Sequence, residues 1–254
     1  MAEARAEILE SGGLLRIILD KPKGNIVSQA MMAAIAEQLA LHASDRALRL
    51  VVLQGANGNF SFGASVEEHR REQAPAMLRA FSQLIRHIAS YPVQVASLVE
   101  GRCLGGGFEL ALASHLVFAT PDAQFGCPEI KLGVFPPVLA ALGPWRLGGA
   151  LSDRLLLTGE TFSGSQAHAL GFAQPASGWE DVLSWYRTGP GHLSAAALRI
   201  ATRAARLGAG ADQILGERLD ALEKLYVERV LPTRDGNEGI EAFLARRPPR
   251  WEDA

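Results

Sequence analysis

The chain has 254 residues, 48% of them hydrophobic, which is enough to bury one sizeable core and excludes a disordered protein. Its 25 basic and 27 acidic residues are interspersed and give a net charge of -2, so neither nucleic acid nor a membrane surface is expected as a partner. The opening MAEARAEILESGG lacks a targeting pattern, no stretch is apolar enough for a membrane span, and two cysteines fit a reducing compartment, so we expect a cytoplasmic protein.

Short strands and helices alternate in the first half of the chain. Runs rich in β-branched residues predict strands at Leu14–Leu19, Leu48–Leu53, Val95–Val99 and Leu116–Ala119. Apolar residues at helical spacing follow Ser28, a candidate N-cap, and a second helix is predicted over Ala74–Ser90. Strands separated by helices of this length require crossover connections, which predicts an α/β core.

The last third of the chain carries helix start and stop signals in place of strand signals. Ser163 with Gln166 fits a capping box, as does Asp235 with Glu238. Gly208 follows a helical stretch in the manner of a C-terminal stop. This part of the chain is therefore predicted to be helical.

The segment VASLVEGRCLGGGFELALAS, residues 95–114, combines a strand, a turn, three glycines and a helical run. Gly105, Gly106 and Gly107 lack Cβ atoms, so another molecule can come close to the N–H groups there. Unpaired N–H groups at the start of a helix can stabilise negative charge on an oxygen atom. A glycine-rich turn that only allows close helix packing is the alternative, and a phosphate loop is excluded because no Lys follows.

Two glutamates stand next to turns of this kind. Glu109 opens an otherwise apolar stretch, where burial would raise its pKa toward the range that suits general acid/base catalysis. A carboxylate that merely complements the helix dipole is the alternative. Glu129 lies in FGCPEIKLG, which by itself is a weak signal because Pro-Glu commonly starts a helix.

A third segment, NFSFGASVEEH at residues 59–69, follows a predicted strand and precedes a predicted helix. It offers a second exposed backbone N–H, at Ala64. Ser65 is interpreted as a helix cap. His69 is predicted to be a solvent-facing helix residue, because no second His, Cys or Asp stands at metal-ligand spacing. No GxSxG motif supports a Ser/His hydrolase.

Taken together, these motifs resemble the crotonase (enoyl-CoA hydratase/isomerase) superfamily from about residue 14 to residue 247. LDKPKGN resembles the family's CoA-contacting turn, FGAS and LGGGFE its two oxyanion-hole segments, and FGCPE the segment of its second catalytic glutamate. The resemblance implies an α/β fold, a spiral of ββα units over residues 1–190. It also implies a helical region over residues 191–254 that assembles the chain into a homotrimer or a dimer of trimers.

The resemblance also implies roles for particular residues. Glu109 and Glu129 would be the acid/base pair, and the N–H groups of Ala64 and Gly106 would form the oxyanion hole for an acyl-CoA thioester, with no separate cofactor and no metal. Retention of both glutamates favours a hydratase. The implied substrate-binding residues are Lys21, Lys23, Gly24, Phe62, Ser65, Gly105, Cys127 and Phe135. Phe243 and Arg246 are expected to reach the ligand of an adjacent subunit.

Three departures from the family pattern bear on the substrate. Ser65 replaces the usual Asp, Cys127 replaces the common Gln, and FPPVL from Phe135 stands where a glycine-rich stretch is usual. A stiff, aromatic wall suits a ring, so we expect water addition to a conjugated enoyl- or cyclic dienoyl-CoA; the alternative is that these residues are simply core. A double-bond isomerase, a ring-opening hydrolase, or a non-catalytic subunit that binds acyl-CoA or RNA are the other interpretations.

Overall fold

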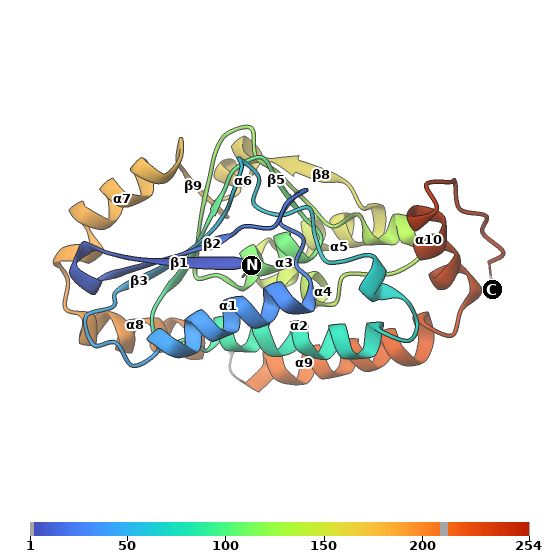
Figure 1. Cartoon of the computed structure of the whole chain (residues 1–254), viewed down its shortest axis with the longest axis horizontal. Helices are drawn as coiled ribbons and strands as arrows, with labels where there is room; N and C mark the ends of the chain where they lie inside the picture. Colours follow the sequence, from blue (N-terminus) through green and yellow to red (C-terminus); the bar gives the residue numbers. More distant parts are fainter. Residues whose placement is uncertain (1–2, 209–212, 254) are drawn as a thin grey trace.

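The computed structural model describes residues 3–208 and 213–253, and its framework is a six-stranded sheet covered by helices (Figure 1). The strand order is β1-β2-β3-β4-β6-β9, with β1 antiparallel to β2 and the other neighbours parallel. A smaller sheet has the order β5-β7-β8. The strands are β1 Ala4–Leu9, β2 Leu14–Leu19, β3 Leu50–Gly55, β4 Val95–Val99, β5 Arg102–Leu104, β6 Leu116–Ala119, β7 Gln124–Gly126, β8 Thr161–Ser163 and β9 Gln174–Pro175.

The helices connect these strands and then continue alone toward the C-terminus. They are α1 Gln29–His42, α2 Ala74–Ala89, α3 Gly106–Ala113, α4 Pro137–Arg146, α5 Gly149–Thr158, α6 Gly164–Ala169, α7 Trp179–Thr188, α8 Ala195–Gly208, α9 Gln213–Leu225 and α10 Arg234–Leu244. Short 3-10 turns include η2 Glu67–His69 and η3 Pro128–Leu132, and a π turn, η5 Tyr226–Val230, follows α9.

Most of the predicted elements of the first half are confirmed. Strands β2, β4 and β6 have the predicted bounds. Strand β3 runs from Leu50 to Gly55 rather than from Leu48 to Leu53, and the Leu48 N–H instead donates to Asp45 O (3.1 Å) in the preceding turn. Ser28 caps α1, its side chain accepting a hydrogen bond from the Met31 N–H.

Of the two capping boxes predicted in the second half of the chain, one is confirmed and one is wrong. Ser163 and Gln166 form the predicted capping box, with reciprocal bonds of 3.2 and 2.8 Å. The box predicted at Asp235 and Glu238 is wrong, since Thr233 is the N-cap of α10 and accepts from the Gly236 N–H at 3.0 Å. Helix α8 extends to Gly208, and the predicted stop there borders residues outside the described ranges.

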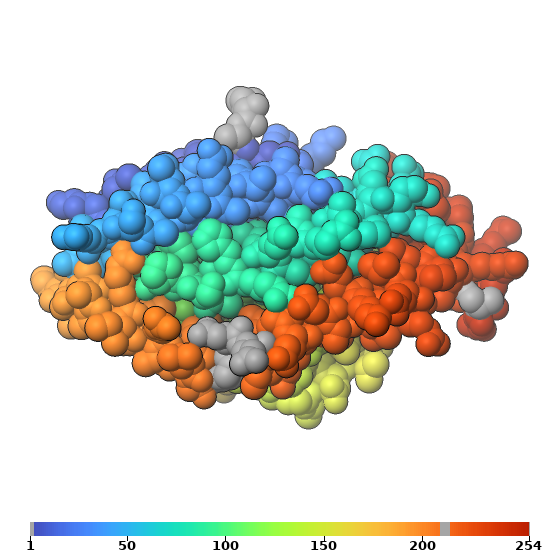
Figure 2. Space-filling view, turned by 90° about the horizontal axis from the view of Figure 1, so that it is seen from below, coloured from blue at the N-terminus to red at the C-terminus, as the bar shows by residue number. Residues whose placement is uncertain are grey.

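The central strands β2, β3, β4 and β6 are buried on both faces of the sheet, which explains why they are mostly apolar, whereas the edge strands β1 and β9 are partly exposed. One face, with Ile17 and Leu53, joins the main core with α1 and α2, while the other, with Val52 and Leu98, joins a smaller core under α7. Helices α1, α2 and α9 lie side by side in Figure 2, and Leu219 of α9 belongs to the main core. The division predicted at residue 190 stays a prediction.

No helix in the described part of the chain combines the length and the apolar character that a membrane crossing requires.

Candidate active site

The chain turns sharply at Gly105, between β5 and α3. Gly105 has φ 49° and ψ -129°, a conformation open to glycine but strained for other residues. Its N–H donates to Gly126 O at 2.8 Å, which fastens the turn to β7. A Cβ atom on Gly105 would lie 2.5 Å from Glu129 Oε1. The turn therefore requires glycine and lies directly against the Glu129 carboxyl.

Glu109 is buried because α3 is buried along its whole length. Its Oε1 accepts hydrogen bonds from the N–H groups of Val138 (2.7 Å) and Leu139 (3.0 Å), at the N-terminus of α4. Such N–H groups have no partner within their own helix, and Pro137 starts α4 at the position where proline is best tolerated. Burial raises the pKa of Glu109 to about 7, although the two hydrogen bonds favour the ionised form.

Glu129 lies on the short turn η3, and its Oε2 is buried without a hydrogen-bond partner among the described residues. Burial, followed by the charge of Glu109, raises the pKa of Glu129 to about 8. The two carboxyl groups thus interact although twenty positions separate them in the chain. Two such groups titrate as a pair, because ionising one carboxyl makes it more costly to ionise the other.

A buried polar network fixes the backbone of residues 59–64. Asn25 Nδ2 donates to Asn59 O (2.9 Å), and Ser61 Oγ donates to Asn25 O (2.8 Å). The Gly63 N–H in turn donates to Ser61 Oγ at 3.1 Å. These bonds position the amide of the next residue, Ala64.

The amides of Ala64 and Gly106 are close neighbours. A Cβ atom on Gly106 would approach Ala64 N to 3.2 Å, so the two backbone segments are almost in contact. Within residues 3–208 and 213–253, neither amide donates a hydrogen bond to another residue. Two free N–H groups beside the acidic pair can together hold one oxygen atom that gains negative charge.

A cavity of about 580 Å³ reaches Ala64 and Glu129, whereas Gly106 and Glu109 lie deeper and are not among the residues that line it. Its lining includes the predicted residues Phe62, Ala64, Ser65, Gly105 and Glu129. A neighbouring cavity of about 540 Å³ is lined by Lys23 and Gly24, and Phe62 lines both. Phe62 therefore borders both cavities, and Gly24 packs so closely against its ring that a Cβ there would lie 2.6 Å from the ring.

Comparison with known proteins identifies the family. Residues 10–254 match the family model Enoyl-CoA hydratase/isomerase. The chain belongs to this family. It is 42% identical over 248 residues to the cyclohexa-1,5-dienecarbonyl-CoA hydratase of Thauera aromatica, which covers 95% of this chain and 94% of that protein. It is also 32% identical to human Enoyl-CoA hydratase domain-containing protein 2, mitochondrial, over 94% of this chain and 85% of that one.

Solved structures agree on the fold. An enoyl-CoA hydratase from Mycobacterium avium subsp. paratuberculosis K-10 superposes with a TM-score of 0.85 at 24% identity, covering 100% of both chains. The predicted crotonase fold and the predicted class of enzyme, an enoyl-CoA hydratase-type lyase, are confirmed.

Not every residue expected at the site of this family member lines the cavity. Lys21 Nζ contacts Glu3 (2.6 Å) and Ser28 Oγ (2.9 Å) instead. Cys127 is fully buried next to the Gly105 turn, and this burial raises the pKa of its thiol well above the usual value. Phe135 packs against Tyr226, with ring centroids 5.4 Å apart.

His69 and Phe243 also line the cavity. The prediction that His69 faces solvent is wrong, because it is half-buried and its Nδ1 lies 2.7 Å from Ser65 O. Burial lowers the pKa of His69, so its ring is neutral at pH 7. The predicted cap at Ser65 is wrong, because Val66 is the N-cap of η2 and the Glu68 N–H makes only a long contact of 3.4 Å with Ser65 Oγ. Phe243 of α10 lies at the cavity of its own chain; a reach into an adjacent subunit stays a prediction.

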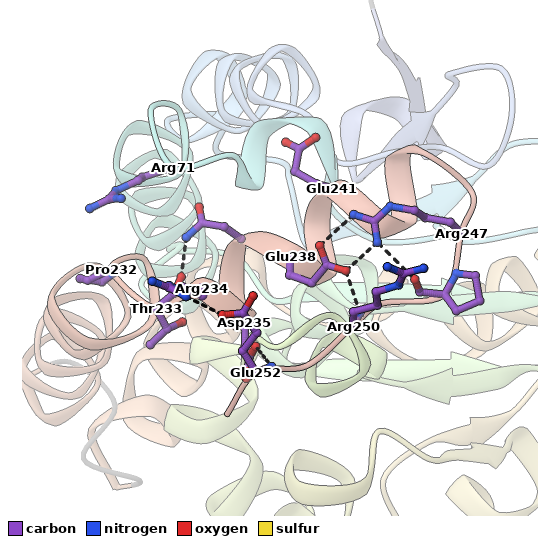
Figure 3. Close-up of a pocket in the computed structure, with 12 residues that line it drawn as sticks. Arg71, Pro232, Thr233, Arg234, Asp235, Glu238, Glu241, Arg247, Arg250 and Glu252 are labelled. Atoms are coloured by element: carbon purple, nitrogen blue, oxygen red, sulfur yellow. Dashed lines mark hydrogen bonds and ion pairs between the residues drawn. The ribbon is translucent and has the colours of Figure 1, made fainter. Parts of the chain in front are cut away.

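A larger cavity, of about 1010 Å³, lies at the C-terminal end of the chain and contains none of the predicted site residues (Figure 3). Two ion pairs join side chains of its lining, Arg247 with Glu238 at 2.6 Å and Arg234 with Glu252 at 2.6 Å. The Arg247 guanidinium holds the pKa of Glu238 at about 2. The lining contains neither the Glu109 and Glu129 carboxyls nor the Ala64 and Gly106 amides, so size alone does not make this cavity the site of the chemistry.

Proposed function

We propose that this enzyme adds water to a conjugated acyl-CoA thioester, converting cyclohexa-1,5-diene-1-carbonyl-CoA into 6-hydroxycyclohex-1-ene-1-carbonyl-CoA. The interacting pair of buried carboxyls beside two free backbone amides carries the proposal. The choice of a cyclic substrate is supported by the relative with 42% identity, which bears the name of that hydratase.

The Ala64 and Gly106 amides bind the thioester oxygen in this mechanism. Attack on the conjugated system moves an electron pair onto that oxygen and forms an enolate. Hydrogen bonds from preorganised donors are stronger to the enolate than to the neutral carbonyl, and one such donor typically lowers the barrier by about 3–4 kcal/mol.

Glu109 and Glu129 transfer the protons. The ionised carboxyl removes a proton from water while the water oxygen attacks the conjugated ring system. The protonated carboxyl then delivers its proton to a carbon of the resulting enolate, which completes the addition of one water molecule. Raised pKa values of about 7 and 8 suit both roles near neutral pH.

The CoA portion of the substrate extends from the first cavity past Phe62 to Lys23 and Gly24. Coenzyme A is part of the substrate, and the mechanism uses neither a separate cofactor nor a metal ion. We also propose a homotrimer or a dimer of trimers, which light scattering on the purified protein tests.

The test of this function is incubation of the purified protein with crotonyl-CoA, a long-chain enoyl-CoA and the cyclic dienoyl-CoA in water enriched in heavy oxygen. Mass analysis should show one solvent oxygen in the alcohol product, formed fastest from the cyclic dienoyl-CoA. An isomerase would incorporate no solvent oxygen into its product. A product without solvent oxygen contradicts hydration, and faster turnover of crotonyl-CoA contradicts the cyclic substrate.

A further inference from the structure

Tyr226 is a buried tyrosine at the point where α9 passes into a π turn. Its side chain is 1% exposed, and the Leu231 N–H donates to Tyr226 O at 3.1 Å, the wider spacing that defines the turn. Turns of this kind inside helices frequently occur at functional sites, because they reorient one side chain at a cost in helix regularity. The π turn alone assigns no role to Tyr226, whose role depends on what its side chain contacts.

The Tyr226 ring stands beside the segment that holds Glu109. It packs against Phe135 with 5.4 Å between centroids and 54° between planes. Phe135 comes three residues before Val138, whose N–H donates to Glu109 Oε1. Burial, followed by the charges of Glu129 and Glu109, raises the pKa of Tyr226 well above its usual value, so its hydroxyl stays protonated and is a hydrogen-bond donor.

The Tyr226 hydroxyl has no hydrogen-bond partner among the described residues, although it is buried. Glu129 Oε2 is likewise buried and has no partner in that part of the chain. Buried polar atoms are almost always paired in folded proteins, because an unpaired one costs about 1–3 kcal/mol. The Tyr226 hydroxyl lies within range of the charges of Glu129 and Glu109. An unpaired donor and an unpaired acceptor in that region match the needs of an alcohol or water oxygen, which both accepts and donates.

We propose that the Tyr226 hydroxyl donates a hydrogen bond to the oxygen that hydration adds to the acyl group, with Glu129 Oε2 as the acceptor for the same oxygen. Tyr226 thereby recognises a hydroxyacyl-CoA thioester and orients the water from which the hydroxyl derives. This role rests on the proposed hydratase function. It makes Tyr226 a substrate-contacting residue, with Phe135 as the neighbour that fixes its ring.

Ligand binding tests the proposal separately from turnover. In the Glu109→Gln background, which blocks elimination, binding of 6-hydroxycyclohex-1-ene-1-carbonyl-CoA is compared with binding of cyclohex-1-ene-1-carbonyl-CoA by titration calorimetry. Adding Tyr226→Phe should weaken binding of the hydroxylated thioester about tenfold and change binding of the hydroxyl-free one less than about twofold. An equal loss for both ligands, or no loss for the hydroxylated one, overturns the proposal.

Tyr91→Phe is the matched control, since Tyr91 is also buried but donates its hydroxyl to Leu39 O at 2.7 Å. Tyr91→Phe should lower the midpoint of chemical unfolding and leave the affinity for both thioesters unchanged. Tyr226→Phe should leave the midpoint unchanged or raise it, because it removes a hydroxyl without a partner among the described residues. A lowered midpoint with unchanged binding selectivity assigns Tyr226 a structural role and overturns the proposal.

The two hypotheses fail in different ways. A wild-type protein that hydrates no enoyl-CoA contradicts the proposed function, whatever the Tyr226 variant does. A hydroxyl-dependent loss of binding still assigns Tyr226 to alcohol recognition in that case, whereas an active hydratase without such a loss contradicts the assignment of Tyr226 alone.

Discussion

Replacing Glu109 by Gln should stabilise the folded protein at alkaline pH while it lowers the rate of hydration at least about 100-fold. The amide oxygen of the new side chain can still accept hydrogen bonds from Val138 and Leu139, so the local structure is preserved. Raising the pKa of Glu109 from 4.5 to about 7 corresponds to roughly 3 kcal/mol, the excess cost of ionising this carboxyl in the folded state. The wild type therefore loses that stability as the pH rises from about 4.5 to about 7, and the amide variant does not.

The assay is urea unfolding at pH 5 and pH 8, at equal protein concentration because subunit association would also affect stability. Glu109→Gln should be more stable than the wild type by up to roughly 3 kcal/mol at pH 8 and by less than about 1 kcal/mol at pH 5. Glu37→Gln, on the exposed side of α1, should show little difference at either pH. A Glu109→Gln protein that is less stable than the wild type at pH 8 refutes the burial argument.

Three further predictions concern the proton pair, the turn and the network around residues 59–64. The rate of hydration should follow a bell-shaped pH profile, falling below about pH 7 and above about pH 8, because the pair must carry one proton; a flat profile from about pH 5 to about pH 9 contradicts this. Gly105→Ala should lower kcat by at least about 100-fold, since its Cβ would displace Glu129; near-normal kcat would show that the turn can relax. Asn25→Ala should lower the free energy of unfolding by about 1–3 kcal/mol, because it leaves Ala56 O and Asn59 O without their donor, and unchanged urea unfolding would contradict the role of the network.

The sequence predicted those parts of the fold whose signal is local and repeated. Strands β2, β4 and β6 are buried on both faces, so their β-branched runs are unambiguous. Strand β5 contains only Arg102–Leu104 and strand β9 only Gln174–Pro175, too short for any periodicity to appear. Their pairing depends on β7 and β6, far away in the chain, and only the fold reveals it.

The candidate site shows the same limit. The order of the motifs in the sequence predicted Glu109, Glu129 and the two glycine-containing segments as site residues. The groups that set the pKa of Glu109 come from elsewhere in the chain. The Val138 and Leu139 amides hold Glu109 because Pro136-Pro137 starts α4 there, a signal that could have been interpreted as a helix start. No sequence motif pointed to Tyr226, because its ring meets Phe135 only through tertiary packing.

Single-turnover hydration by Glu109→Gln and Glu129→Gln tests the central claim most directly, namely that two interacting carboxyls perform the chemistry opposite the Ala64 and Gly106 amides. Each variant should bind the cyclic dienoyl-CoA with nearly wild-type affinity and convert it at least about 100-fold more slowly. If either variant retains wild-type rates of alcohol formation, the carboxyl pair is not the acid/base machinery and the account is wrong.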